Sequence, residues 1–176
     1  PCKVVVSDVP RPMFYEQLKR DLDPIGRLEA ASELTKNAST EDVNILGERL
    51  KKEKEWGVAI RIAKALGKIG GEEARNFLIK GLKNSNPKIR KGIISALGNF
   101  CHDKKSILSI RQFAEKDPSY RVEAVALQML GKIKDKDSFA FLESSISRKS
   151  HNAMAQTAIY NALAEFEDEA SWDYLI

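Results

Sequence analysis

The residues that could do chemistry are few in this chain and poorly spaced for it. Cys101, His102 and Asp103 are adjacent, but consecutive residues of a helix point in different directions, so these side chains do not converge. His151 lies far from His102, and neither is followed by glutamate, whereas a peptidase zinc site needs paired histidines one turn apart and a glutamate base. Cys2 is remote from Cys101, which argues against a disulfide or a zinc framework. We expect no catalytic, cofactor-binding or metal-ligating residue.

Other polar and aromatic candidates have structural explanations. Glu72 and Glu73 open a helix, where carboxylates favour the positive end of the helix dipole. The acidic cluster at residues 165–169 is interpreted as a solvated edge. Trp56 and Tyr120 stand near helix starts, and we expect them to pack within helical hairpins rather than to stack on a base or ligand.

A repeat determines the elements that would position any site. A short apolar block recurs at intervals of 32, 31, 33 and 33 residues. In the three central blocks, apolar residues lie four and eight positions before an aligned leucine, which is the spacing of one helix face. The aligned leucines are Leu34, Leu66, Leu97, Leu130 and Leu163. Repeats of this length indicate a stacked solenoid, because one helical hairpin cannot bury its own apolar face.

The repeat predicts an all-α fold, a right-handed α-solenoid of about five helical hairpins. Each first helix carries the aligned leucine, and a shorter second helix follows; Pro24, Pro87 and Pro118 are expected to open first helices.

The β-branched stretch before Pro10 predicts a strand at residues 3–7. We assign residues 1–11 to a linker and strand from a preceding β domain, and residues 12–176 to the solenoid. Because the chain starts without methionine, we interpret it as part of a longer protein. No apolar run reaches the ~18 residues of a membrane span, so no membrane partner is expected.

Charge is distributed unevenly. Residues 47–111 hold sixteen Lys and Arg against six Asp and Glu, whereas residues 150–176 hold five acids and no Lys or Arg. A basic middle can attract anions, although long basic side chains can also simply solvate outer helix faces. A nucleic-acid surface would need cations aligned on successive second helices. The candidates are Arg49, Lys52, Arg75, Lys83, Lys104 and Arg111.

Two stretches, "IRKGIISALG" and "VEAVALQMLG", resemble the core of the short HEAT repeats of phycobilisome lyases. The order of segments, from "RPMFYEQLKRDLDPIGRLEAASEL" through "EWGVAIRIAKALGKIG" to "DPSYRVEAVALQMLGKI" and Trp172, is similar to the C-terminal helical domain of aminopeptidase N (gluzincin) enzymes. The resemblance implies a noncatalytic domain of a zinc metalloaminopeptidase that packs on the catalytic part and shapes peptide access. Zinc would belong to the parent chain, because this chain has no H-E-x-x-H motif.

Two functions therefore remain open. In the first, the partners are other domains of the same polypeptide and, indirectly, a peptide substrate, and the location is cytoplasmic. In the second, the chain is a free-standing HEAT scaffold or nucleic-acid-binding module that uses a basic inner groove. The strand at residues 3–7 favours the first function, and the basic middle at residues 47–111 favours the second.

Overall fold

The computed structural model describes residues 10–147 and 153–166, and within these residues the chain forms ten α-helices and no strand. The strand expected at residues 3–7 lies outside the described residues. The helices are α1 (Arg11–Arg20), α2 (Pro24–Glu33), α3 (Thr40–Lys52), α4 (Trp56–Ile69), α5 (Gly71–Gly81), α6 (Pro87–Leu97), α7 (Lys104–Lys116), α8 (Tyr120–Ile133), α9 (Lys136–Ser145) and α10 (Ala153–Ala164). The helical content confirms the all-α solenoid.

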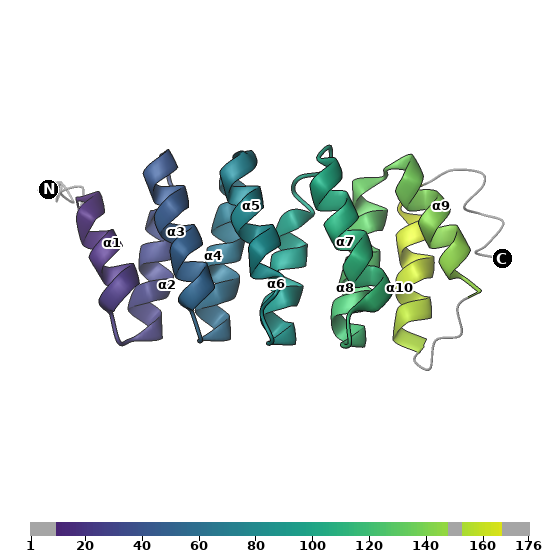
Figure 1. Cartoon of the computed structure of the whole chain (residues 1–176), viewed down its shortest axis with the longest axis horizontal. Helices are drawn as coiled ribbons and strands as arrows, with labels where there is room; N and C mark the ends of the chain where they lie inside the picture. Colours follow the sequence, from purple (N-terminus) through teal and green to yellow (C-terminus); the bar gives the residue numbers. More distant parts are fainter. Residues whose placement is uncertain (1–9, 148–152, 167–176) are drawn as a thin grey trace, which may run out of the picture.

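The helices form two layers along one axis, with the odd-numbered helices in one layer and the even-numbered helices in the other (Figure 1). Turns at residues 21–23, 53–55, 82–86 and 117–119 join α1, α3, α5 and α7 to the even helix that follows each of them. Because α1 packs on α2, grouping each odd helix with the even helix that follows it gives five pairs, which begin one helix before the aligned leucines suggest. The helix before each leucine-bearing helix completes the pair, and α1 completes the first one.

Local chemistry sets where the even-numbered helices begin. Pro24 and Pro87 occupy the first helical position of α2 and α6, where a missing amide hydrogen leaves no partner unsatisfied. Asp23 and Asn86 precede them, and each side-chain oxygen accepts a first-turn backbone amide at 2.9 Å. Pro118 does not open its helix, because α8 begins at Tyr120.

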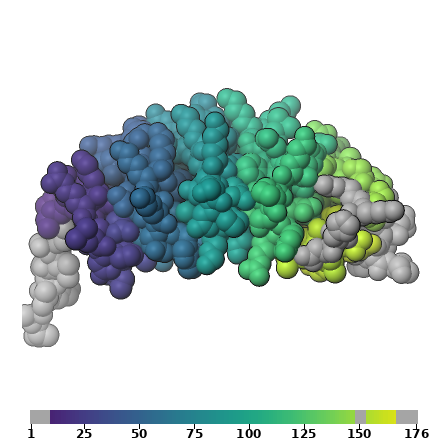
Figure 2. Space-filling view, turned by 60° about the horizontal axis from the view of Figure 1, so that its bottom comes forward, coloured from purple at the N-terminus to yellow at the C-terminus, as the bar shows by residue number. Residues whose placement is uncertain are grey.

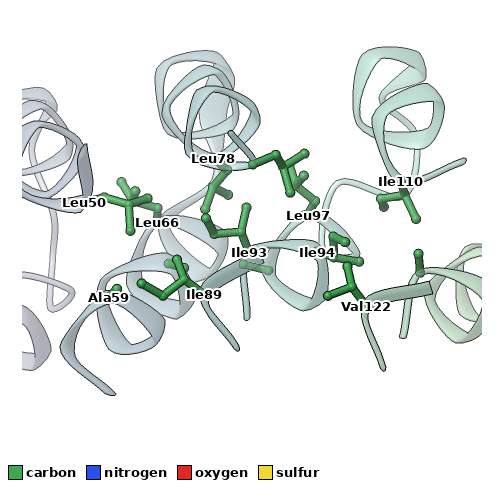
Figure 3. Packing of buried hydrophobic residues seen from close by; sticks show 14 of the residues in the cluster. Leu50, Ala59, Leu66, Leu78, Ile89, Ile93, Ile94, Leu97, Ile110 and Val122 are labelled. Atoms are coloured by element: carbon green, nitrogen blue, oxygen red, sulfur yellow. The ribbon is translucent and has the colours of Figure 1, made fainter. Parts of the chain in front are cut away.

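The core lies between the two layers. All five aligned leucines have no exposed surface, which confirms the register read from the repeat. In the middle of the stack, Leu78 of α5 faces Ile93 and Leu97 of α6 (Figure 3). The two helices of a hairpin therefore bury their apolar faces against each other and against the neighbouring hairpins.

Small residues let the even-numbered helices approach one another closely. A β-carbon added at Gly67 of α4 would lie 2.8 Å from the Ala96 carbonyl oxygen of α6. One added at Gly131 of α8 would lie 2.6 Å from the backbone of Ala162 in α10. Among the odd-numbered helices, α3 packs on α5, but α1 touches α3 and α5 touches α7 only lightly. Because the even layer is the more closely spaced, the stack bows toward it, and the outline is a shallow arch (Figure 2). We call the even-numbered helices the inner layer and the odd-numbered helices the outer layer.

This packing predicts opposite results for two glycines of the same helix. Gly67→Ala should destabilise the protein by roughly 1 to 3 kcal/mol, because the new methyl group would force α4 and α6 apart. Gly57→Ala should be neutral or stabilising by up to about 1 kcal/mol, because the only nearby atom is a Glu55 carboxylate oxygen at 4.0 Å. Urea denaturation of both variants tests this expectation, and equal losses at the two positions would contradict the close approach of the inner helices.

Buried ion pairs tie two inner helices, α2 and α6, to the turn of the next hairpin. Arg27 of α2 contacts Glu53 with its Nε at 3.0 Å, and Arg90 of α6 contacts Asp117 with its Nε at 2.7 Å. All four side chains are at most 9% exposed. The hydrogen bonds that Arg90 donates to Asp117 raise the pKa of its guanidinium, and burial only partly opposes them.

Glu53 accepts hydrogen bonds from two arginines, Arg27 of α2 and Arg49 of α3. Burial alone would raise the pKa of Glu53, but hydrogen bonds from the Glu55 amide, Arg27 and Arg49 outweigh it and hold the pKa below its ordinary value. The carboxylate therefore stays ionised, and it compensates the buried charge of Arg27.

Between these two pairs the repeat places neutral residues at both equivalent positions. Seven residues before their aligned leucines stand Arg27, Ala59 and Arg90. The positions three residues before α4, α6 and α8 hold Glu53, Asn84 and Asp117 in turn. The turn therefore carries an acid when the inner helix before it carries a buried arginine. It carries asparagine when that helix has the fully buried Ala59 instead.

Candidate interaction surface

The six cations expected to form a basic surface lie in the outer layer or in the turn that follows α5. Arg49 hydrogen-bonds Glu53 at 2.7 Å. Arg75 is only 8% exposed and contacts Glu72 and Asp103. Arg111 pairs with Glu115 at 3.5 Å and lies over the Phe141 ring. The three lysines of the set are exposed: Lys52, Lys83 and Lys104. Half of the set is thus engaged by neighbouring side chains, and none of the six belongs to the inner layer.

The Cys101, His102 and Asp103 cluster ends in a helix cap. Asp103 precedes α7 and accepts the Ser106 amide at 2.7 Å and the Ser106 hydroxyl at 2.9 Å, while Arg75 contacts its second oxygen. Burial alone would raise the pKa of Asp103, but the Ser106 hydrogen bonds and the Arg75 charge lower it below its ordinary value. The carboxylate is therefore committed to capping and ion pairing. Over residues 10–147 and 153–166 no cluster of three His, Cys, Asp or Glu could hold a metal ion; His151 is outside those ranges.

A different set of cations is exposed on the inner layer. Arg61, Lys64 and Lys68 stand at helical spacings of three and four on α4, so they share one face. Lys88 and Lys91 stand three apart on the neighbouring helix α6. All five side chains are exposed, and none takes part in an ion pair within the part of the chain that the structure describes. We call these five residues the basic inner surface.

The sequences of α4 and α6 contain no Asp or Glu, so nothing within either helix neutralises the basic inner surface. On one side, α8 adds the exposed cations Arg121 and Lys132 and a single acid, Glu123. Beyond α8, α10 has no charged residue. On the other side of the basic inner surface, α2 carries Glu29 and Glu33. The neighbouring helices α4, α6 and α8 thus form a positive zone. The axes of its outermost helices are about 16 to 20 Å apart at the usual interaxial distance of 8 to 10 Å.

Apolar side chains border this zone at the start of the inner helices. Trp56 and Tyr120, expected to pack within hairpins, are instead 45% and 54% exposed, because each is the first residue of its helix and points away from the core. The Lys88 ammonium group lies 4.5 Å from the centre of the Trp56 ring, an attractive cation–π distance. An aromatic edge and a row of cations therefore lie side by side.

The six cations expected from the sequence belong to the second helices and the turn after α5, whereas the five exposed cations of the basic inner surface belong to α4 and α6. The signal was present, because "WGVAIRIAKALGKI" and "PKIRKGIISAL" combine five exposed cations with no acid. The second helices also carry cations, but α3 and α5 hold as many acids as cations, and the arginines of α3, α5 and α7 form ion pairs. No helix in the described ranges is long and apolar enough to cross a membrane.

Comparisons with known proteins support the fold. The family model for HEAT repeats matches residues 12–98 and 107–176. A chain from the complex of CpcE and CpcF of phycocyanin lyase from Nostoc sp. PCC7120 is similar, with a TM-score of 0.67 and 18% identity over 99% of this chain and 73% of that one. Human deoxyhypusine hydroxylase in complex with glycerol has a TM-score of 0.55 and 18% identity over 89% of this chain and 73% of that one. An engineered protein has a TM-score of 0.53 and 17% identity over 95% of this chain and 86% of that one.

Identities this low show the fold alone, and they carry no activity over to this chain. No curated protein matches the sequence. The narrower resemblance to aminopeptidase N enzymes receives no support from the family model or from these structures. The matched residues nevertheless cover most of the sequence, and the two-layered stack of hairpins agrees with them. This chain therefore belongs to the HEAT-repeat family.

Proposed function

We propose that this chain is a noncatalytic binding scaffold that holds an acidic segment of a partner protein on its basic inner surface. The observation that carries the proposal is the set of five exposed cations on α4 and α6, two neighbouring helices without a carboxylate. A rigid array of like charges attracts an oppositely charged partner and orients it during encounter.

The extent of the positive zone favours a polypeptide over duplex nucleic acid. Duplex DNA carries phosphates along its whole length, so a duplex lying along the stack would also meet Glu29 and Glu33 on α2. Exposed aromatic side chains beside the zone, such as Trp56 and Tyr120, are typical of protein interfaces. The Nostoc protein of similar fold occurs in a complex of two chains, which is consistent with a protein partner.

The narrower hypothesis of an aminopeptidase parent stays a prediction based on the order of the helical segments. Under that hypothesis the acidic partner would be another domain of the same polypeptide, zinc would be held elsewhere in the parent chain, and the location would be cytoplasmic. Residues upstream of Pro1 that contain a H-E-x-x-H helix would support it. The binding surface proposed above would be the same in either case.

The test is a fluorescence-anisotropy titration of the chain with a labelled peptide of about 20 residues that alternates Glu and Ser, at about 0.15 M ionic strength. The double variant Lys64→Glu with Lys91→Glu should weaken binding at least about tenfold, since it replaces attraction by repulsion at two points. The matched control, Lys52→Glu with Lys104→Glu, makes the same change in net charge on the exposed outer layer. It should change the affinity by less than about twofold.

Two results would reject the proposal. Equal effects of the inner and outer variants would show that only net charge matters. Nanomolar binding of a labelled duplex of about 20 base pairs, with an affinity that falls about 1000-fold between roughly 0.05 and 0.2 M salt, would instead support the nucleic-acid alternative.

A further inference from the structure

The first turns of the inner helices form an edge with an unusual number of exposed apolar side chains. Ile25, Trp56, Tyr120 and Met154 are 62%, 45%, 54% and 42% exposed. Each is the first or second residue of its helix, in α2, α4, α8 and α10 respectively. The turns that precede α2, α4 and α8 lie along the lower edge of the stack (Figure 1), and Figure 2 turns that edge toward the viewer. We call these four residues the apolar rim.

The rim adjoins the basic inner surface directly. Lys88 is the second residue of α6, the inner helix next to α4, and its ammonium group lies over the ring of Trp56, the first residue of α4. Arg121 follows Tyr120 in α8 and is exposed. An apolar and a cationic side chain therefore contact each other at Trp56 and Lys88, and a second aromatic and cationic pair is adjacent in sequence at Tyr120 and Arg121. A partner that used both would need carboxylates and large apolar side chains in the same short segment.

We infer, on the basis of the function proposed above, that the acidic partner segment binds in an extended conformation along the apolar rim, with two large apolar side chains seated on Trp56 and Tyr120. These two residues belong to α4 and α8, which are two helix spacings apart, or about 16 to 20 Å. An extended chain advances about 3.3 to 3.6 Å per residue, so six residues span about 20 Å. Side chains of an extended chain alternate between two faces, so residues six apart point to the same side and residues five apart do not.

A single-stranded nucleic acid fits this edge less well. Its bases would have to stack on the aromatic rings, and the Lys88 ammonium group already lies over the Trp56 ring. A peptide side chain can instead contact the ring edge, while a neighbouring carboxylate pairs with that same ammonium group. The combination of charge and exposed aromatic surface therefore favours an acidic, apolar peptide.

The experiment compares three labelled peptides of about 14 residues by fluorescence anisotropy with the 176-residue chain. The first alternates Glu and Ser, the second carries Phe at two positions six apart in the same background, and the third carries Phe at two positions five apart. The second peptide should bind at least about tenfold more tightly than the first, because each seated Phe removes apolar surface from water. The third peptide should also bind more tightly than the first, but its increase in the logarithm of the affinity should be no more than about half that of the second peptide. Only one of its Phe side chains can reach the rim at a time.

Two variants locate the effect. Trp56→Ala should bring the affinity ratio of the second peptide to the first close to one, whereas Leu108→Ala, which truncates an exposed leucine of the outer helix α7, should leave that ratio unchanged. The thermal midpoint of Trp56→Ala confirms that the variant is folded. Equal affinities of the three peptides would overturn the rim inference while leaving the proposed function intact, provided that Lys64→Glu with Lys91→Glu still weakens the first peptide. Tighter binding of a single-stranded oligonucleotide than of any peptide would reject both.

Discussion

Replacing Asp117 by asparagine is expected to lower the free energy of unfolding by about 3 to 5 kcal/mol, the usual cost of removing one charge from a buried ion pair. The Asp117 side chain has no exposed surface, and its two oxygens accept hydrogen bonds from Arg90 at 2.7 and 2.8 Å. Without the carboxylate, the Arg90 guanidinium stays buried and keeps only neutral partners, the carbonyl oxygens of Asn84 and Ser85 among them. Urea denaturation measures the loss.

Another repeat of the same chain shows which uncharged residues can replace the buried ion pair of Arg90 and Asp117. One hairpin earlier, the equivalent positions hold Ala59 and Asn84, so Arg90→Ala combined with Asp117→Asn reproduces a pair that the fold already accommodates. The double variant should lose at least about 2 kcal/mol less than the sum of the two single variants, because neither charge is then left without its partner. Simple additivity would contradict the role assigned to the pair. Glu16→Gln, which breaks an exposed pair with Arg20, serves as the control and should cost about 0.5 kcal/mol or less.

Truncation of Leu97 to alanine is the second large effect, and it should cost about 2 to 5 kcal/mol. Leu97 has no exposed surface and lies at the end of α6, where it faces Leu78 of α5 and Ile93 of its own helix (Figure 3). The neighbouring helices are held by their own contacts and cannot close fully around the cavity, so the cost exceeds the transfer free energy of the lost methyl groups.

The matched control for Leu97 is Leu108→Ala, the same substitution at a leucine that is 63% exposed on α7. It should change the free energy of unfolding by about 0.5 kcal/mol or less. Denaturation curves of both variants at one temperature give the comparison. Similar costs at the two positions would mean that the repeat register does not identify the core.

Much of this fold could be predicted from the residues, because the determinants are local. The spacing of Leu34, Leu66, Leu97, Leu130 and Leu163 sets the register, and all five are buried. Proline at the first position of α2 and α6 marks where those helices begin. Each hairpin needs its neighbours in the same way, so a constant period along the chain is sufficient to indicate a linear stack.

The interaction surface could be predicted only in part. The sequence by itself determined the helices, the buried face of each helix and the basic region at residues 47–111. Arg49 and Arg111 pair with acids four residues away, but only the tertiary structure decided the pairing of the arginines whose acids are distant in sequence. Arg75 meets Asp103, and Arg90 meets Asp117, only once the hairpins are stacked. The choice of inner layer is likewise tertiary: it follows from the close approach of the even-numbered helices at glycine positions, and the periodicity of a single helix carries no information about the distance to its neighbour.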